Sequence, residues 1–355
     1  MLTVVVILST VILFVPSVTA EKAKQSAWIV PMVASLAGVV TLWLVTQLGR
    51  RFPNDTLPQY SQMILGKFFG KLLVVWYCFF FIFASILIVH EFIEFTSITL
   101  LPATPPMVLS LSLMLVGVYA TSKGLEVIAR MNQFIFPLLL IALMVGFILS
   151  WFKMDLDRLL PLLEEGIKPV IVASWTPASW YGEVIFIAFI FPQLNKPKEI
   201  FKKGFLGLML AAGIMAMMIF FTIAIFGSEL SSSFTFPFWS IIRYLEFGKY
   251  IQRLEIFLFV IWISSMVIKI SVFIYMGNFS ITQLFSIKFK TALYPLAGLV
   301  VFASVYSFKN IERFMEVLTI LWPPIALISE IGFPVFLLIA AILRGKKGGD
   351  RRLKR

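Results

Sequence analysis

Ten apolar stretches decide what this chain can fold into. Each is close to, or longer than, the roughly 20 apolar residues that a helix needs to cross a bilayer. Lipid offers no partner to unpaired backbone groups, so such stretches cross as helices. We therefore predict an all-α integral membrane protein with ten transmembrane helices. The spans are expected at residues 2–20, 27–49, 71–97, 106–121, 130–152, 172–194, 204–226, 251–285, 292–307 and 313–343.

The composition agrees with this class and excludes others. The 355 residues are 60% hydrophobic and 14% charged, whereas soluble domains are about 45–50% apolar and about 25% charged. A single cysteine, Cys78, excludes an internal disulfide, and a single histidine, His90, excludes a histidine metal cluster. The sequence shows no nucleophile motif and no phosphate-binding loop. We expect neither an enzyme nor a bound cofactor or metal.

The first span ends in "VPSVTA", which is similar to a signal-peptide cleavage site. It lacks a basic region before the apolar run, and nine further spans follow, so we predict that it is retained. It begins almost at Met1, which leaves open a natural start a few residues upstream.

The distribution of Lys and Arg predicts the orientation. With the N-terminus inside, the inner segments carry 19 basic residues and the outer segments ten. This asymmetry follows the positive-inside rule, so both termini are expected in the cytoplasm. The inner segment 50–71 and the basic tail 344–355 are candidates for contact with anionic headgroups. The tail is equally a candidate for contact with a cytoplasmic domain of a partner.

After the residues at the span ends are counted with the connections, five charged side chains remain inside the predicted spans: Glu91, Glu94, Glu183, Lys269 and Glu330. A charge in mid-membrane is costly, and such residues usually face a partner or a cavity. Glu183, Lys269 and Glu330 are predicted deep in the membrane. Glu91 and Glu94 share a helix face with His90 near the outer end of span three, where either headgroup contact or a function explains them. Lys269 is expected to pair with Glu183 or Glu330, or to take the place of a coupling cation.

Span six is predicted to be interrupted at mid-membrane. In "SWYGEVIFIAFIFPQL", Glu183 follows Gly182, and Pro177 and Pro192 stand on either side. Irregular backbone at this depth is tolerated where it lines a cavity. Glu183 is therefore expected to face a central site.

Span one contains a second irregularity. Ser9 and Thr10 lie at its middle, and Pro16 follows about a turn and a half later. Proline removes a backbone donor, which favours a break, although a simple kink with Ser and Thr bonding back to the previous turn also accounts for it.

Interruptions at corresponding places in two halves indicate a transporter built from inverted repeats. Spans one and six are the first spans of two five-span halves, and an odd number of spans makes the repeats inverted. We expect one transmembrane domain, with repeat one at about 1–152, repeat two at about 172–343, and a cytoplasmic tail at 344–355.

These residues resemble a known family. The chain is similar to the spore-germination permeases, the B subunits of nutrient germinant receptors, within the amino acid–polyamine–organocation superfamily. The resemblance rests on "ILFVPSVTAEKAKQSAWI" (12–29), "RRFPNDTLPQYSQMILGKFFGK" (50–71), "GLEVIARMNQFIFPLLL" (124–140), "LLPLLEEGIKPV" (159–170), "YGEVIFIAFIFPQLNKP" (181–197), "IQRLEIFLFVIWI" (251–263) and "LTILWPPIAL" (318–327).

The resemblance implies a five-plus-five inverted repeat with broken helices one and six around a central site. The family's glycine–glutamate pair in helix six matches Gly182 and Glu183. Ser9 stands where relatives usually carry glycine, which puts a glycine-dependent unwinding of helix one in doubt. The family also implies three partners: a small germinant, a larger membrane subunit with soluble domains, and an outer lipoprotein. It further implies the spore inner membrane.

Such a site suits a small zwitterion such as an amino acid. Amides of a half-helix around Phe14–Ser17 are predicted to hold its carboxylate, and Glu183 or nearby carbonyls its ammonium. Aromatic side chains are candidates for closing over it. The expected ligand-binding set is Ser9, Thr10, Phe14, Pro16, Trp180, Tyr181, Gly182 and Glu183.

Two functional classes remain open. The first is a ligand-sensing receptor subunit, in which the germinant shifts a conformational equilibrium that partner subunits detect. The second is a proton-coupled amino-acid permease in which Glu183 or Lys269 titrates. The fold serves both, so fold cannot choose between them. The outer segment 153–171 is expected to form either a short surface helix or a solvated loop.

Overall fold

The computed structural model describes residues 1–244 and 254–348, and within these residues it contains helices and no β-strand. The long helices are α1 (Leu2–Ala23), α2 (Val30–Arg51), α4 (Lys67–Thr99), α5 (Pro106–Lys123), α6 (Leu125–Trp151), α7 (Lys168–Tyr181), α9 (Ile200–Ser233), α11 (Leu254–Phe285) and α12 (Phe289–Tyr306). Shorter elements are η1 (Lys24–Ile29), α3 (Leu57–Leu65), η2 (Leu156–Leu159), η3 (Gly182–Phe186), α8 (Ile187–Ile190), η4 (Phe191–Gln193), η5 (Pro197–Glu199) and α10 (Pro237–Tyr244).

The predicted spans are confirmed as helices. The described part of the chain contains nine stretches long and apolar enough to cross a membrane. The first of them, Leu2–Arg51, includes both α1 and α2, so each of the ten expected spans has a counterpart. The start of the predicted span 251–285 and most of the tail 344–355 lie outside the described residues.

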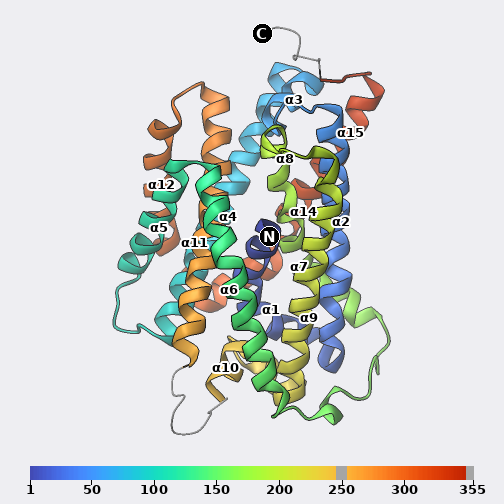
Figure 1. Cartoon of the computed structure of the whole chain (residues 1–355), viewed down its shortest axis with the longest axis vertical. Helices are drawn as coiled ribbons and strands as arrows, with labels where there is room; N and C mark the ends of the chain where they lie inside the picture. Colours follow the sequence, from blue (N-terminus) through green and yellow to red (C-terminus); the bar gives the residue numbers. More distant parts are fainter. Residues whose placement is uncertain (245–253, 349–355) are drawn as a thin grey trace.

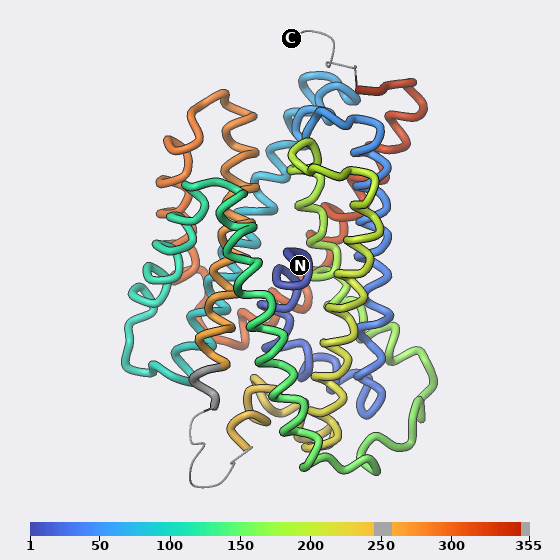
Figure 2. The backbone as a smooth tube through the Cα atoms, in the orientation of Figure 1, coloured from blue at the N-terminus to red at the C-terminus, as the bar shows by residue number. Residues whose placement is uncertain are grey.

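α1 lies at the centre of the bundle (Figure 2). Its residues from Thr3 to Ala20 are mostly apolar, and all of them are buried inside the protein instead of facing the lipid. α5 and α12 lie together on one flank of the bundle, and α2 and α9 lie on the other. α1 is thus a core helix that contacts protein on every side, whereas the flanking helices expose large apolar side chains to the lipid.

The connections predicted to be inner all lie at one end of the molecule, the upper end in Figure 1. They include α3, the turns before α6 and α12, and the last described residues of the chain. The N-terminus lies at about mid-height, and α1 leads from there to the lower end. The more basic set of connections is therefore gathered at one end of the bundle, as the alternation of spans requires.

Glycine allows two of the tight connections at this end. Gly66 separates α3 from α4 and Gly124 separates α5 from α6, each as a single residue with φ of 86° and 94°. Side-chain-bearing residues rarely adopt this left-handed region, and glycine adopts it freely. α3 itself begins with a capping box formed by Thr56 and Gln59, which satisfies donors at its first turn.

The expected break in span one is not found, because α1 is a continuous α-helix from Leu2 to Ala23. Hydroxyl groups bond back to the preceding turn around the proline: Ser17 Oγ donates to the Phe14 carbonyl at 3.0 Å and Thr19 Oγ1 to the Val15 carbonyl at 2.7 Å. The simple kink therefore describes Pro16 better than an unwound segment does. α1 ends at Ala23, well beyond Pro16, and its C-cap residue Lys24 has a φ of 48°.

The interruption of span six is confirmed. α7 ends at Tyr181, and the 3₁₀ segment η3 replaces α-helix before the single turn of α8. Span ten is also irregular, which the sequence analysis did not predict. It consists of α13 (Ile311–Glu316), the π segment η6 (Val317–Leu321), α14 (Trp322–Leu327), the π segment η7 (Ile328–Gly332) and α15 (Phe333–Leu343).

The outer segment 153–171 contains one 3₁₀ turn, η2, and then packs against η1. Gln25 donates to the Pro161 carbonyl at 2.9 Å, and Ser26 Oγ accepts from the Leu163 amide at 2.9 Å. The segment is therefore a loop docked on the end of α1 rather than a surface helix.

Close packing of α2 on the interrupted span predicts a stability difference between two glycines. A β-carbon at Gly38 would stand 2.6 Å from the Tyr181 carbonyl oxygen and 2.8 Å from Leu208 Cδ2. Because the Tyr181 backbone cannot move aside cheaply, we expect Gly38→Ala to destabilise the protein by about 1–3 kcal/mol. The measurement is the thermal unfolding midpoint of the detergent-purified protein.

Gly213→Ala is the matched control, because nothing lies within 4 Å of its β-carbon position in α9. Alanine favours a helix interior over glycine by about 1 kcal/mol, so this variant should unfold at the same or a higher temperature. Equal midpoints for the two variants would contradict the close approach of α2 and α7.

Candidate functional site

A buried ion pair joins three spans at the centre of the molecule. Lys269 Nζ of α11 lies 2.7 Å from Glu183 Oε2 of η3 and donates a hydrogen bond to Thr10 Oγ1 of α1 at 2.6 Å. The exposed fractions of the three residues are 0%, 2% and 1%. Such close packing leaves neither charge in contact with solvent.

This arrangement explains how a lysine is tolerated deep in the bundle. Removing two charges from water is costly, and their mutual attraction offsets the cost only with close geometry and further hydrogen bonds. Glu183 supplies the opposite charge and Thr10 supplies the further acceptor. Of the two predicted partners of Lys269, Glu183 forms the ion pair. Thr10 of span one belongs to the same cluster.

A second polar contact links α11 to α1 at Ser9, the residue before Thr10. Trp262 Nε1 donates to the Ser9 carbonyl at 2.7 Å, and Ser9 Oγ donates to the Val5 carbonyl at 2.7 Å. Trp262 precedes Lys269 by seven residues, which places both side chains on one face of a helix. Trp262 was not among the expected site residues, although its spacing from Lys269 was a usable signal.

Glu330 of span ten meets the interruption of span six. Its side chain lies directly against Gly182, so that a β-carbon at residue 182 would overlap the carboxylate. Gly182 has helical φ and ψ of −71° and −14°, so here glycine provides space rather than conformational freedom. Glu330 is fully buried, and neither carboxylate oxygen has a hydrogen-bond partner among the described residues.

The π segment η7 places Glu330 in this position, and α4 supports it. Tyr77 Oη donates to the Ser329 carbonyl at 2.7 Å, and Trp76 Nε1 donates to Ser329 Oγ at 2.8 Å. π segments inside helices occur frequently at functional sites. The predicted coupling role of Glu330 remains a prediction, but its placement beside Glu183 was not evident from the sequence.

Glu91 and Glu94 have different surroundings, although they are one turn apart in α4. Glu91 is 2% exposed, and its Oε1 has no partner among the described residues. Glu94 Oε1 lies 3.2 Å from His90 Nε2. His90 Nδ1 lies 2.7 Å from the Ser304 carbonyl, and since a carbonyl only accepts, Nδ1 carries the hydrogen.

Three of the expected ligand-binding residues lie in packed surroundings. Phe14 packs its ring against Phe236 and Phe314, with centroid separations of 5.2 Å and 5.9 Å. Trp180 and Tyr181 are buried, and the Tyr181 hydroxyl has no partner among the described residues.

The amides around Phe14–Ser17 lie within the continuous helix α1. Pro16 lies in the same helix interior. The carboxylate site expected at a half-helix end is therefore not formed here.

The central ion pair predicts a specific pattern of stability. Lys269→Met leaves Glu183 buried without its partner, so we expect a loss of about 3–5 kcal/mol. Glu183→Gln combined with Lys269→Met removes both charges and should recover most of that loss. The measurement is the thermal unfolding midpoint of the purified protein for both single variants and the double variant.

Arg130→Met provides the matched control for removing a charge. Arg130 pairs with Glu126 at 2.6 Å, but the two side chains are 71% and 76% exposed. Exposed pairs contribute little, so this variant should keep the parental midpoint. If the double variant lost as much stability as the sum of the losses in Glu183→Gln and Lys269→Met, the two residues would not be a coupled pair.

Comparison with solved structures identifies the architecture. The crystal structure of MhsT in complex with L-phenylalanine matches this chain with a TM-score of 0.67 and 14% sequence identity. The match covers 96% of this chain and 97% of that one. MhsT is a LeuT-fold transporter, and this chain therefore has an inverted-repeat transporter fold.

Comparison with known sequences identifies the family. Spore germination protein KB of Bacillus subtilis (strain 168) is 26% identical over 331 residues, which cover 92% of this chain and 89% of that protein. Spore germination protein YndE of the same organism is 25% identical over 338 residues, covering 94% and 92%. Residues 1–313 match the family described as "Spore germination protein". The chain belongs to this family of spore germination permeases.

Proposed function

We propose that this protein is the transporter-like membrane subunit of a spore nutrient germinant receptor. It binds a small germinant, an amino acid or a similar zwitterion, in the central site and signals to partner subunits. The observation that carries the proposal is the buried cluster of Glu183, Lys269 and Thr10 at the interruption of span six. The names of the relatives, all spore germination proteins, support the same role.

The charges of the cluster suit a zwitterion. An amino acid carries one ammonium and one carboxylate, and Glu183 and Lys269 offer one opposite charge to each. The ligand exchanges with the internal pair: its carboxylate takes the ammonium of Lys269, and its own ammonium takes Glu183. MhsT, which shares the fold, was crystallised with L-phenylalanine, and this supports an amino acid as the class of ligand.

A tightly packed site favours sensing by a change of conformation. The three residues of the cluster are at most 2% exposed, so a ligand has to separate Glu183 from Lys269 before it fits between them. A ligand shifts an equilibrium only through its different affinity for the two states. In the closed state Glu183 and Lys269 pair with each other, and in the open state each pairs with the opposite charge of the ligand. The ligand therefore has affinity for the open state alone.

The alternative is a proton-coupled amino-acid permease, which one observation favours. Glu330 and Glu91 are buried carboxyl groups with oxygens that have no hydrogen-bond partner among the described residues, and Glu330 lies against Gly182, next to Glu183. Buried carboxyl groups in transporters are typical of proton relays. In this alternative a proton moves between these groups when the ligand displaces Glu183 from Lys269.

The proposed receptor includes partners and a location. The partners are a larger membrane subunit and a lipoprotein subunit, as the family resemblance implies. The basic end of the bundle, where the last described residues lie, faces the cytoplasm according to the positive-inside rule, although Met1 lies at mid-height rather than at that end. The membrane is the inner membrane of the spore.

The experiment that tests this function measures binding and uptake together. Radiolabelled amino acids are presented to the purified protein in detergent, and then to proteoliposomes with an imposed proton gradient. Saturable binding without uptake supports the receptor subunit, and gradient-driven uptake supports the permease. If none of the amino acids binds, even after the partner subunits are co-reconstituted, the proposed class of ligand is wrong.

Glu183→Gln tests the role of the carboxylate. The amide keeps the shape but loses the charge for the ligand's ammonium, so we expect ligand binding to weaken at least 100-fold, about 3 kcal/mol for a charged hydrogen bond. Radioligand binding measures the effect, and Glu94→Gln, away from the pair, is the control. Unchanged affinity in Glu183→Gln would remove this residue from the site.

Ser9 tests whether α1 borders the ligand. Ser9 is fully buried and its carbonyl accepts from Trp262. Ser9→Gly keeps that carbonyl and adds no bulk, so we expect binding within a few-fold of the parent. Ser9→Leu overfills the contact between α1 and α11, at a cost of about 1–3 kcal/mol, and we expect at least tenfold weaker binding. A leucine variant that folds and binds normally would place the ligand elsewhere.

A further inference from the structure

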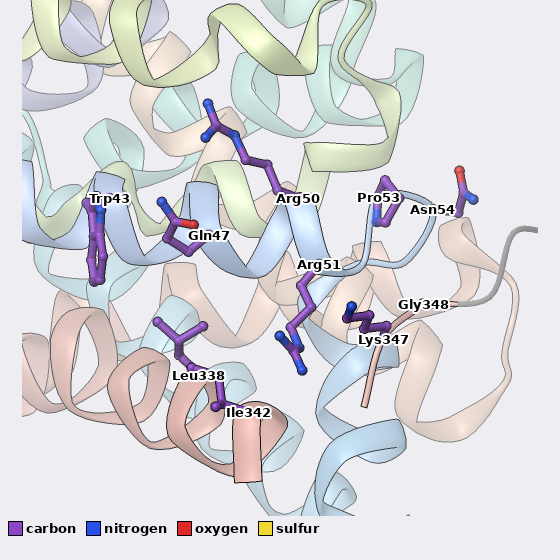
Figure 3. Close-up of a pocket in the computed structure, with 10 residues that line it drawn as sticks. All are labelled: Trp43, Gln47, Arg50, Arg51, Pro53, Asn54, Leu338, Ile342, Lys347 and Gly348. Atoms are coloured by element: carbon purple, nitrogen blue, oxygen red, sulfur yellow. The ribbon is translucent and has the colours of Figure 1, made fainter. Parts of the chain in front are cut away.

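A groove opens at the basic end of the bundle, between the end of α2 and α15 (Figure 3). Its volume is about 720 Å³, within the range of about 300–1,000 Å³ that is usual for small-molecule sites. Residues from two spans far apart in sequence form it, together with the chain that follows α15. The groove is distant from the central ion pair, and the proposed function does not use it.

One wall of the groove is apolar and lies along the membrane. Trp43 of α2 and Ile342 of α15 are 46% and 57% exposed, and Leu338 lies half-buried between them. Tryptophan is enriched where the hydrocarbon meets the headgroups. This wall therefore suits an acyl chain that enters from the lipid.

The mouth of the groove is basic. Arg50 and Lys347 are exposed there, and neither takes part in the ion pairs found among the described residues. Among the residues that the structure describes, the groove lining contains no Asp or Glu. Asp55 is buried beside Gly348, with its Oδ2 3.2 Å from where a β-carbon of that glycine would stand.

Arg51 gives the mouth a fixed shape. It donates from Nη2 to the Ala341 carbonyl at 3.0 Å and from Nε to the Lys346 carbonyl at 2.5 Å. The Gly348 amide returns a bond to the Arg51 carbonyl at 2.9 Å. These bonds hold the chain after α15, including Lys347, against the end of α2, while the Arg50 side chain points away from Lys347 (Figure 3).

We infer that this groove binds one anionic phospholipid. Its phosphate lies at Lys347, the exposed side chain of Arg50 turns from the other side of α2 to reach it, and an acyl chain follows Trp43, Leu338 and Ile342. Basic pockets between transmembrane helices are suited to anionic headgroups. A free phosphate ion would leave the apolar wall unused, and a zwitterionic lipid would bring a cationic group to the basic mouth. The bound lipid links α2 to α15, the helix that follows the π segment of Glu330.

The test is native mass spectrometry of the delipidated protein in detergent, titrated with phosphatidylglycerol or with phosphatidylcholine of the same acyl chains. Phosphatidylglycerol should bind at least tenfold more tightly. Arg50→Gln with Lys347→Gln should weaken it about 25-fold, since each basic group near an anionic surface contributes about fivefold. Ile342→Trp fills the apolar wall without changing charge and should also weaken binding.

Lys288→Gln with Lys290→Gln is the matched control. Both lysines are exposed at the same end of the bundle, outside the groove, and the net charge changes equally. This variant should bind phosphatidylglycerol like the parent. Comparable binding of the two lipids, or equal losses in the two double variants, would overturn the site. Displacement of the lipid by glycerol 3-phosphate at similar concentrations would show an anion site without a lipid site.

Discussion

The ammonium group of Lys269 is the constraint on which the centre of this structure depends. A lysine that cannot reach water has to find an opposite charge and a further acceptor within about 3 Å. It finds Glu183 in span six and Thr10 in span one. The position of α11 between these spans is therefore fixed by electrostatics as well as by packing, and the three helices form one polar unit in an apolar bundle.

The irregular segments of the fold meet at this unit. η3 replaces α-helix at Glu183, and η7 brings Glu330 against Gly182. A regular α-helix in span ten would rotate Glu330 away from its present position, because a π segment inserts one additional residue per turn. α4 holds this segment through Tyr77 and Trp76. The backbone departs from α-helix where Glu183 and Glu330 lie, and π segments inside helices occur frequently at functional sites.

Much of the fold was predictable from the sequence, because apolar length alone identifies spans in a chain with so few charges. That Lys269 pairs with a buried carboxylate was also predictable, since a buried charge requires a partner, but the choice of Glu183 over Glu330 was not. The contacts of Trp262 and Ser329 were not, because helical periodicity gives the faces of a helix but not which helices are neighbours. The break expected at Pro16 failed for a local reason: hydroxyls of Ser17 and Thr19 bond back to the preceding turn, so the proline does not unwind α1.

The continuity of α1 changes how a ligand would be held. In the arrangement expected from the sequence, open amides of a broken helix one receive the carboxylate, and Glu183 serves only the ammonium. With α1 intact, Lys269 is the cation at the interruption of span six, so the ligand's carboxylate competes with Glu183 for it. In the binding mode that we propose, the internal pair opens, and the hydrogen bond from Lys269 to Thr10 connects this opening to α1. A receptor subunit and a permease share this exchange. They differ only in whether the opposite end of the bundle opens afterwards.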